Sequence, residues 1–142
     1  MPRFGPHSIA HLADVDPRLR TLFNEVIKHW DCQVIDGRRT VAEQAKNVAK
    51  GVSKTMKSKH LEGLAVDVMP YPYDWNKIEK GLLALKKADP TMQIAEVYMF
   101  IGFVRGIAIS QGIDLRQGAD WDSDNQFEDH TFVDLPHHEI DE

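Results

Sequence analysis

Residues 58–67 read Ser-Lys-His-Leu-Glu-Gly-Leu-Ala-Val-Asp, and the fold prediction rests on this segment. It leads into a short apolar run, 65–69, which is rich in β-branched residues and interrupted by one carboxylate, Asp67. Such a run is typical of a strand. A turn at Gly63 would fold His60 back beside that strand. The sequence therefore predicts that His60 and Asp67 meet in space.

A single helix through these residues would keep the two side chains apart. Positions seven apart on an α-helix are separated by about 10 Å along its axis, whereas zinc ligands each lie within ~2.0–2.2 Å of the metal. On a strand, Asp67 lies on the face opposite Val66 and Val68, so the valines can face a core and the carboxylate a cleft. A carboxylate there is costly to bury unless it is paired or bound to a metal. The competing interpretation is that His60 and Asp67 are unrelated surface groups.

A second cluster of titratable residues, 134–139, reads Asp-Leu-Pro-His-His-Glu. The proline favours extended backbone before it, and the residues after it have the pattern of a terminal strand. If Ile140 faces the core, His138 shares its face, while His137 and Glu139 face the cleft. A one-residue slip would exchange the two histidines. Two histidines and one carboxylate form a catalytic zinc set that leaves the fourth position for water. The candidate ligands are His60, Asp67 and His137.

The rest of the chain predicts helices early and few, scattered strands, which favours an α+β fold over a doubly wound sheet. We expect a small antiparallel sheet flanked by helices, in a single domain spanning residues 1–142. Asp16 and Pro17 are typical of a helix start, and Thr40 with Glu43 forms a capping box. The predicted helices are 17–30, 40–50, 76–88 and 90–112, and the predicted strands are 33–35, 65–69 and 137–140. Residues 113–142 show further short strand-like pieces, separated by an acidic loop.

Composition excludes several classes of protein. The 142 residues carry 17 basic and 22 acidic side chains, a net charge of −5. Nucleic-acid binding needs clustered Lys and Arg, and no basic stripe is present. Cys32 is the only cysteine, which excludes a disulfide scaffold and predicts an inert buried thiol.

Residues 1–10 have no apolar stretch of signal-peptide length, and the longest apolar run, 97–104, is too short for a membrane helix. We expect a soluble protein made in the cytoplasm, without membrane insertion.

An acidic segment between residues 120 and 129 raises the question of a calcium site. Its alternating carboxylates resemble the start of a calcium loop, but glycine is missing at the sixth place and the twelfth is Thr131. A solvated acidic turn is the favoured interpretation, and calcium binding is the alternative. Trp121 either lines the cleft or belongs to the core. The carboxylates concerned are Asp120, Asp122 and Asp124.

Four sequence motifs resemble those of a known family. They are Ser58-x-His60-x-x-Gly63-x-Ala65-x-Asp67, Asp134-x-x-His137-x-Glu139, Gly37-Arg38-Arg39-Thr40 and Gly118-Ala119-Asp120-Trp121. In this order they resemble the zinc peptidases of the D-Ala-D-Ala carboxypeptidase and L-alanyl-D-glutamate endopeptidase type, in particular short phage endolysins. The resemblance covers about residues 35–140. It implies the hedgehog and D-Ala-D-Ala peptidase type of fold, with a zinc site in the cleft.

The resemblance also implies a role for individual residues. His60, Asp67 and His137 would bind Zn²⁺. Asp134 would be the general base that activates the attacking water, and Arg39 would stabilise the developing oxyanion or hold a substrate carboxylate. Ser58 and Trp121 would contact the substrate. Members of the family often have an aromatic or aliphatic residue where this chain has His138.

The expected function is hydrolysis of the stem peptide of peptidoglycan by an L-alanyl-D-glutamate endopeptidase that acts as a phage endolysin. The alternatives are a D-Ala-D-Ala carboxypeptidase or dipeptidase and, in another class, a non-catalytic zinc-stabilised binding module. We expect no separate cell-wall-binding domain and a monomeric protein. It would remain in the host cytoplasm until a holin releases it to the wall.

Overall fold

A computed structural model describes residues 1–53, 55–79, 92–127 and 132–142. The elements, in chain order, are α1 (Pro6–Ala13), α2 (Pro17–Val26), β1 (Cys32–Asp36), α3 (Val41–Ala49), the 3-10 turn η1 (Lys59–Glu62), β2 (Ala65–Pro70), α5 (Met92–Ser110), β3 (Leu115–Gln117) and β4 (His137–Ile140). The expected α+β class is confirmed.

The strands form one antiparallel sheet with the order β1-β2-β4-β3. The last strand of the chain therefore lies inside the sheet, next to β2. A β-bulge between Val34 and Asp36 shifts the register of β1 against β2, so that Asp36 lies opposite Asp67. Bulges of this kind re-aim a side chain within a sheet, and here the bulge brings two carboxylates together.

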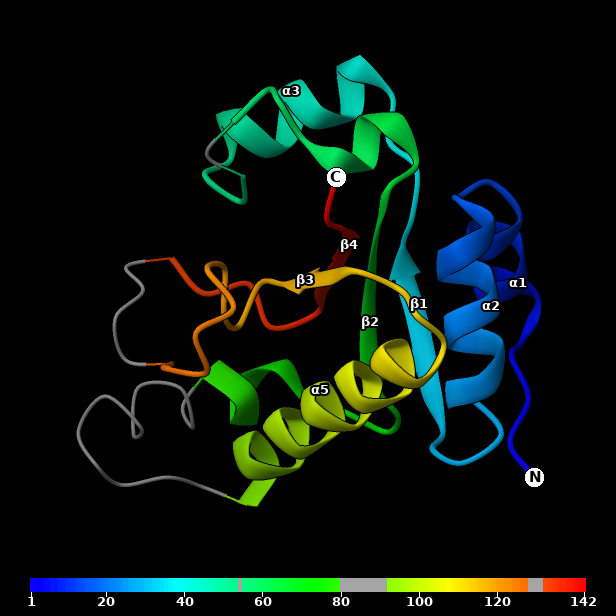
Figure 1. Ribbon diagram of the computed structural model, residues 1–142. Helices are drawn as coiled ribbons and strands as arrows, with labels where there is room; N and C mark the ends of the chain where they lie inside the picture. Colours follow the sequence, from blue (N-terminus) through cyan, green and yellow to red (C-terminus); the bar gives the residue numbers. More distant parts are fainter. Residues whose placement is uncertain (54, 80–91, 128–131) are drawn as a thin grey trace.

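One face of the sheet carries the main hydrophobic core. In Figure 1, α1 and α2 lie side by side next to β1, and α5 runs across the lower part of the sheet. Burial of apolar side chains between these helices and the sheet is the main force that holds the layers together. The buried strand residues of this core are Cys32, Val34, Val66, Val68 and Ile140, and its helix residues include Leu12, Leu22, Phe23, Phe100 and Val104.

The helix starts follow the predicted capping chemistry. The Asp16 side chain accepts a hydrogen bond from the Arg18 backbone N–H, and a proline follows at the first helical position of α2. Thr40 and Glu43 form the reciprocal capping box at the start of α3. Each cap satisfies backbone donors that the first helical turn leaves without a partner.

The structure differs from the sequence-based expectations in three places. The short helix α1 was not predicted. The helix α2 ends at Val26, and residues 27–29 form turns, so the predicted end at residue 30 is wrong. Residues 75–79 are helical, while most of the predicted helix 76–88 lies outside the described residues.

The opposite face of the sheet is divided between a second apolar cluster and a cleft. Met69, at the end of β2, packs with α5 residues such as Ile94 and Val97.

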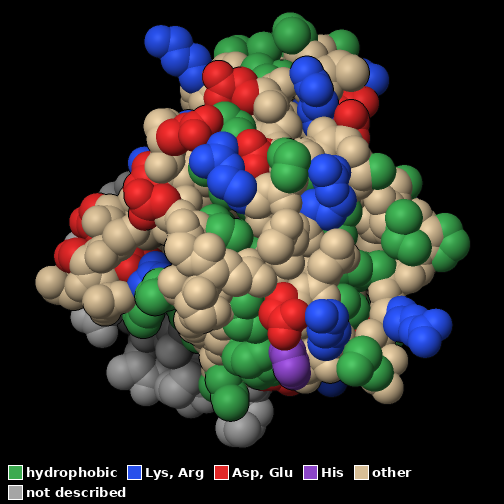
Figure 2. Space-filling model, turned by 45° about the vertical axis from the view of Figure 1, so that its right-hand side comes forward, with side chains coloured by type: hydrophobic (Ala, Val, Ile, Leu, Met, Phe, Trp, Pro, Cys, Tyr) green, Lys and Arg blue, Asp and Glu red, His purple; other side chains and the backbone are tan. Residues whose placement is uncertain are grey.

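Cys32 is buried, and burial raises the pKa of its thiol to about 12, as expected of an inert cysteine. None of the described helices is both long and apolar enough to cross a membrane. On the face shown in Figure 2, acidic side chains gather at the upper left, and basic side chains lie among them and to the right.

Candidate metal centre and active site

The 3-10 turn η1 places His60 beside β2. The hydroxyl of Ser58 accepts a hydrogen bond from the backbone N–H of His60 and so begins the turn. Gly63 ends it with φ of 71°, a left-handed conformation that glycine adopts without steric cost. The Cβ of any other residue there would also lie 3.3 Å from the Asp14 carbonyl oxygen. The predicted turn at Gly63 is confirmed.

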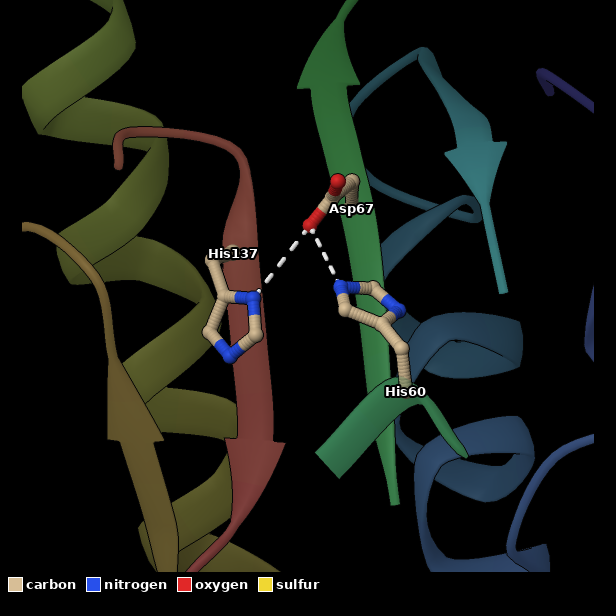
Figure 3. A group of neighbouring side chains, drawn as sticks. All are labelled: His60, Asp67 and His137. Carbon is tan, nitrogen blue, oxygen red and sulfur yellow. Dashed lines mark hydrogen bonds and ion pairs between the residues drawn. The ribbon is translucent and has the colours of Figure 1, made fainter. Parts of the chain in front are cut away.

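The register of the sheet brings Asp67 and His137 together. The two residues are directly opposite each other on β2 and β4. One carboxylate oxygen of Asp67, Oδ1, lies 3.2 Å from Nε2 of His60 and 3.4 Å from Nδ1 of His137. Figure 3 shows both rings directed at this oxygen from opposite sides. The predicted convergence of three side chains from distant segments is present, and the alternative of unrelated surface groups is wrong because all three are buried.

The outer nitrogen of each imidazole has its own partner. Nδ1–H of His60 donates to the carbonyl oxygen of Gly37 at 2.7 Å. Nε2–H of His137 donates to the carboxylate of Glu139 at 2.9 Å. Such contacts fix the tautomer and the orientation of metal-binding histidines. They leave Nε2 of His60 and Nδ1 of His137 as the nitrogens that face Asp67.

The three donor atoms fit a divalent cation of the zinc type. They lie within 4.8 Å of one another. Ligands placed 2.0–2.2 Å from one tetrahedral ion are separated by about 3.4 Å, close to the separations of 3.2 Å and 3.4 Å from Asp67 Oδ1. Imidazole nitrogens and a carboxylate oxygen are donors that zinc accepts.

The charges of the cluster also suit a cation. Burial raises the pKa of Asp67, but hydrogen bonds from His137 and His60 outweigh this effect and hold that pKa below its usual value. Burial lowers the pKa of His137, but hydrogen bonds to Asp67 and Glu139 raise it to about 9. Because histidine binds a metal only when it is neutral, a cation that enters the cluster must displace this proton.

Asp134 lies at the edge of the cluster, with Oδ2 3.8 Å from Nδ1 of His137. Burial, together with the negative charge of Asp67, raises its pKa to about 6. The backbone of Gly118 holds this segment from both sides: its carbonyl accepts from the N–H of Asp134 at 2.9 Å, and its N–H donates to the carbonyl of His137 at 3.0 Å. A carboxyl group with such a pKa is suited to accept a proton near neutral pH.

Arg39 lies beside the same cluster and is largely buried. Its Nε donates to Asp36 at 2.6 Å, its Nη1 to Gln44 at 3.0 Å and its Nη2 to Asp67 at 3.3 Å. The bulge in β1 makes this possible because it sets Asp36 opposite Asp67. Arg39 therefore holds the second oxygen of Asp67, while the first oxygen faces the two histidines.

A cleft of about 930 Å³ opens over the cluster. Trp121 forms part of its wall: the indole N–H donates to the carbonyl of Phe132 at 3.0 Å, and the ring centroid lies 5.2 Å from that of His137. Of the two interpretations of Trp121, the cleft lining is therefore confirmed. Ser58 also lines the cleft, although its hydroxyl caps η1. Contact of either residue with a substrate stays a prediction.

His138 lies on the core face of β4, as strand alternation predicts. It is fully buried and makes edge-to-face contacts with Phe23 and Phe100. Its Nδ1 accepts a hydrogen bond from Gln117 at 3.2 Å. The side chain therefore points away from the cluster, and His137 is the histidine of β4 that faces the candidate metal centre.

The acidic segment forms a second group of carboxylates. Asp120, Asp122 and Asp124 each offer an oxygen within 4.8 Å of the others. Asp120 is buried, and its Oδ2 accepts hydrogen bonds from Arg105 and from the backbone N–H of Asn125. These contacts stabilise a turn within the protein. The interpretation as a solvated acidic turn holds for Asp122 and Asp124, which are exposed, and is wrong for Asp120, which is buried. Calcium binding stays a prediction.

Two residues of the site were not assigned a role from the sequence. Glu139 was placed on the cleft face by strand alternation, and its spacing of two from His137 could have identified it as a partner. Arg116, which pairs with Glu139 at 3.0 Å, comes from β3 and belongs to no recognisable motif. Its position depends on the pairing of β3 with β4, which a single sequence does not reveal.

Comparisons with known proteins agree with this geometry. Residues 1–140 match the family model described as phage L-alanyl-D-glutamate peptidase. The L-alanyl-D-glutamate peptidase of Escherichia phage T5 is 33% identical over 135 residues, which cover 89% of this chain and 87% of the relative. The crystal structure of the Serratia marcescens L-Ala D-Glu endopeptidase ChiX has the same fold, with a TM-score of 0.69 at 24% identity over 99% of this chain and 91% of that one. The chain belongs to the family of phage L-alanyl-D-glutamate peptidases.

Proposed function

We propose that this protein is a zinc-dependent endopeptidase that hydrolyses the L-alanyl–D-glutamate bond in the stem peptide of peptidoglycan. The observation that carries the proposal is the convergence of His60, Asp67 and His137 next to Asp134, at the base of an open cleft. Family membership supports the bond cleaved. The donor set supports zinc, which would be held by these two imidazoles and one carboxylate.

Bound zinc would supply a Lewis acid that polarises the scissile carbonyl and makes water a better nucleophile near neutral pH. Asp134 takes the proton from the attacking water and then passes it to the leaving amine. This role requires an unprotonated carboxylate within hydrogen-bond reach of that water, and the raised pKa of Asp134 suits the transfer in both directions.

Among the described residues, Arg39 is a cation in direct contact with Asp67 of the cluster. We propose that it keeps Asp67 in its orientation and stabilises negative charge as the carbonyl carbon becomes tetrahedral, because a guanidinium remains charged at any relevant pH. The aromatic wall at Trp121 and the polar rim at Ser58 would hold the peptide on either side of the reacting bond.

The biological role that follows is lysis of the bacterial host. In this proposal the protein acts as a monomer on the cell wall, and a separate holin gives it access to that wall from the cytoplasm. The single domain would bind its substrate through the cleft.

The test is hydrolysis of purified peptidoglycan, with the released peptides identified by mass spectrometry. The expected result is cleavage between L-Ala and D-Glu that stops on chelation and returns with zinc. The Asp134→Asn variant is expected to lose activity by a factor on the order of 10²–10⁴ and to retain its zinc and its fold. Asp141→Asn is the matched control, because Asp141 is exposed and outside the cleft.

The alternatives give different results in the same assay. Release of terminal D-Ala alone would identify a carboxypeptidase or dipeptidase. A protein that binds zinc and walls but releases no peptide would be a binding module. An Asp134→Asn variant that lyses walls at the normal rate would show that the base is a different group.

A further inference from the structure

Two guanidinium groups line the cleft, and they differ in how much of their hydrogen-bonding capacity is used. Each of the three nitrogens of Arg39 donates to a protein side chain, and the Arg39 side chain is only 10% exposed. The Arg116 side chain is 37% exposed, and Glu139 is the acceptor recorded for it among the described residues. Since a guanidinium has five N–H donors, Arg116 retains donors for a ligand.

We propose that Arg116 is a specificity-determining residue that binds a free carboxylate on the substrate residue next to the cleaved bond. The inference rests on the proposed function and names the chemical group that the cleft recognises. Arg116 would bind the substrate carboxylate, while Arg39 remains hydrogen-bonded to Asp67.

The surroundings of Arg116 orient its planar group. The guanidinium carbon lies 5.7 Å from the centroid of the Trp121 ring, and Nη2 donates to Oε2 of Glu139 at 3.0 Å. An aromatic face on one side and an ion pair at one edge limit the rotation of the group. A held guanidinium can offer a pair of parallel N–H groups to a carboxylate, the bidentate geometry that gives such pairs their selectivity.

Glu139 links Arg116 to the candidate metal centre. Its Oε1 accepts from His137, while its Oε2 accepts from Arg116. Arg116 is directly opposite Glu139 in the sheet, so strand geometry puts the Cα atoms of Arg116 and His137 roughly 8 Å apart. A carboxylate held by Arg116 would thus lie within about one substrate residue of the reacting carbonyl.

The substrate chemistry fits this distance. Glutamate that is acylated at its amino group has two carboxyl groups. When the chain continues through one of them, the other stays free and negative.

The Nε of Arg116 is buried without a hydrogen-bond partner among the described residues. This is a further sign that the protein alone does not use all of the donors of Arg116.

The experiment compares two synthetic peptides, N-acetyl-L-Ala-γ-D-Glu-L-Lys and the analogue in which the free carboxylate of D-Glu is a carboxamide. Loss of hydrogen bonds to a charged group costs roughly ten- to a hundredfold. We therefore expect kcat/KM of the wild type to be at least tenfold higher for the carboxylate peptide. In Arg116→Gln the ratio is expected to fall to about one, mainly through KM. Arg38→Gln, at an exposed arginine outside this cleft, is the matched control.

A binding arm separates recognition from turnover. The dissociation constants of both peptides are measured by calorimetry in the Asp134→Asn background, with and without Arg116→Gln, and zinc affinity is measured by chelator competition. We expect the substitution at Arg116 to abolish the preference for the carboxylate while the zinc content stays the same.

Equal binding of the two peptides by the protein with Arg116, or an unchanged preference without it, would overturn the inference. The binding measurements test the role of Arg116 even if the wild type cleaves neither peptide. A wild type that cleaves neither peptide would overturn the proposed function, so the two failures are distinguishable.

Discussion

In the proposed mechanism, the carboxyl group of Asp134 makes peptidoglycan hydrolysis depend on pH. Burial and the charge of Asp67 raise its pKa to about 6. Below that pH the group is protonated and cannot accept a proton from water. We expect kcat/KM for peptidoglycan hydrolysis to rise with pH through about 6 and to fall about tenfold for each pH unit below it. A pH–rate profile between pH 4.5 and 8 checks this.

His137, a proposed zinc ligand, also titrates, so the metal must be followed in the same experiment. In the proposed metal centre, protonation of His137 would release zinc, whereas protonation of Asp134 would leave it bound. Zinc content measured at each pH separates these effects. A rate that stays constant down to pH 5, with zinc still bound, would mean that Asp134 is not the base.

At the scale of elements, the segment that carries Asp134 is held in place by one glycine. The Cβ of an alanine at Gly118 would lie 2.2 Å from the carbonyl oxygen of Asp134, a separation that real structures do not allow. The backbone of residues 134–137 would have to move away from β3. We expect Gly118→Ala to destabilise the protein by about 1–3 kcal/mol and to lower kcat at least tenfold, as measured by urea unfolding and peptide release.

A glycine elsewhere provides the matched control. Gly106 lies on the exposed side of α5, and an added Cβ there meets nothing within 4 Å. Because alanine favours a helix interior over glycine by about 0.5–1 kcal/mol, Gly106→Ala should stabilise the fold and leave the activity unchanged. If both substitutions had the same effect on kcat, the close approach at Gly118 would have no part in catalysis.

Local patterns predicted the elements that carry the site better than they predicted the rest. The apolar run with Asp67 has the length and the β-branched residues of a strand, and all of its residues are buried. Gly63 identifies the turn before it. Helix α1 was missed because only Ser8 and Leu12 of its eight residues are buried, too weak a pattern to indicate a helix. The end of α2 was placed too late because the apolar residues continue into the turn that follows it.

The side-chain partners that the sequence did not predict come from contacts between distant segments of the chain. The bulge that sets Asp36 opposite Asp67, and with it the full set of partners of Arg39, depends on the register of two strands. The pair formed by Arg116 and Glu139 depends in the same way on the neighbouring strand. Such pairings join residues that are far apart in the chain, so no local pattern records them.

At the scale of the whole molecule, β4 separates two environments. His137 faces the cleft with Asp67, while its neighbour His138 faces the core with Phe23 and Phe100. The sheet therefore serves as the wall between a polar site and an apolar core. Since His138 is uncharged in that core, its protonation would lower the stability of the fold.

Burial, with a smaller effect from the charge of His137, lowers the pKa of His138 to about 3, whereas an unfolded chain has a histidine pKa of ~6.5. Between these values the unfolded state binds a proton that the folded state does not. The free energy of unfolding therefore falls as the pH falls from about 6.5 to about 3, and the slope from this one group is about 1.4 kcal/mol per pH unit. Above pH 6.5 both states are neutral at this position, and the effect vanishes.

We expect His138→Leu to remove this slope, because leucine has a similar volume and no titrating group. Urea unfolding of both proteins between pH 4 and 8, in the same excess of chelator, gives the difference in slope without a contribution from metal release. Packing changes alter the stability of the variant equally at every pH, so they do not affect the comparison. Parallel curves for the two proteins below pH 6.5 would contradict the prediction, because they would mean that His138 binds a proton as readily in the folded core as in the unfolded chain.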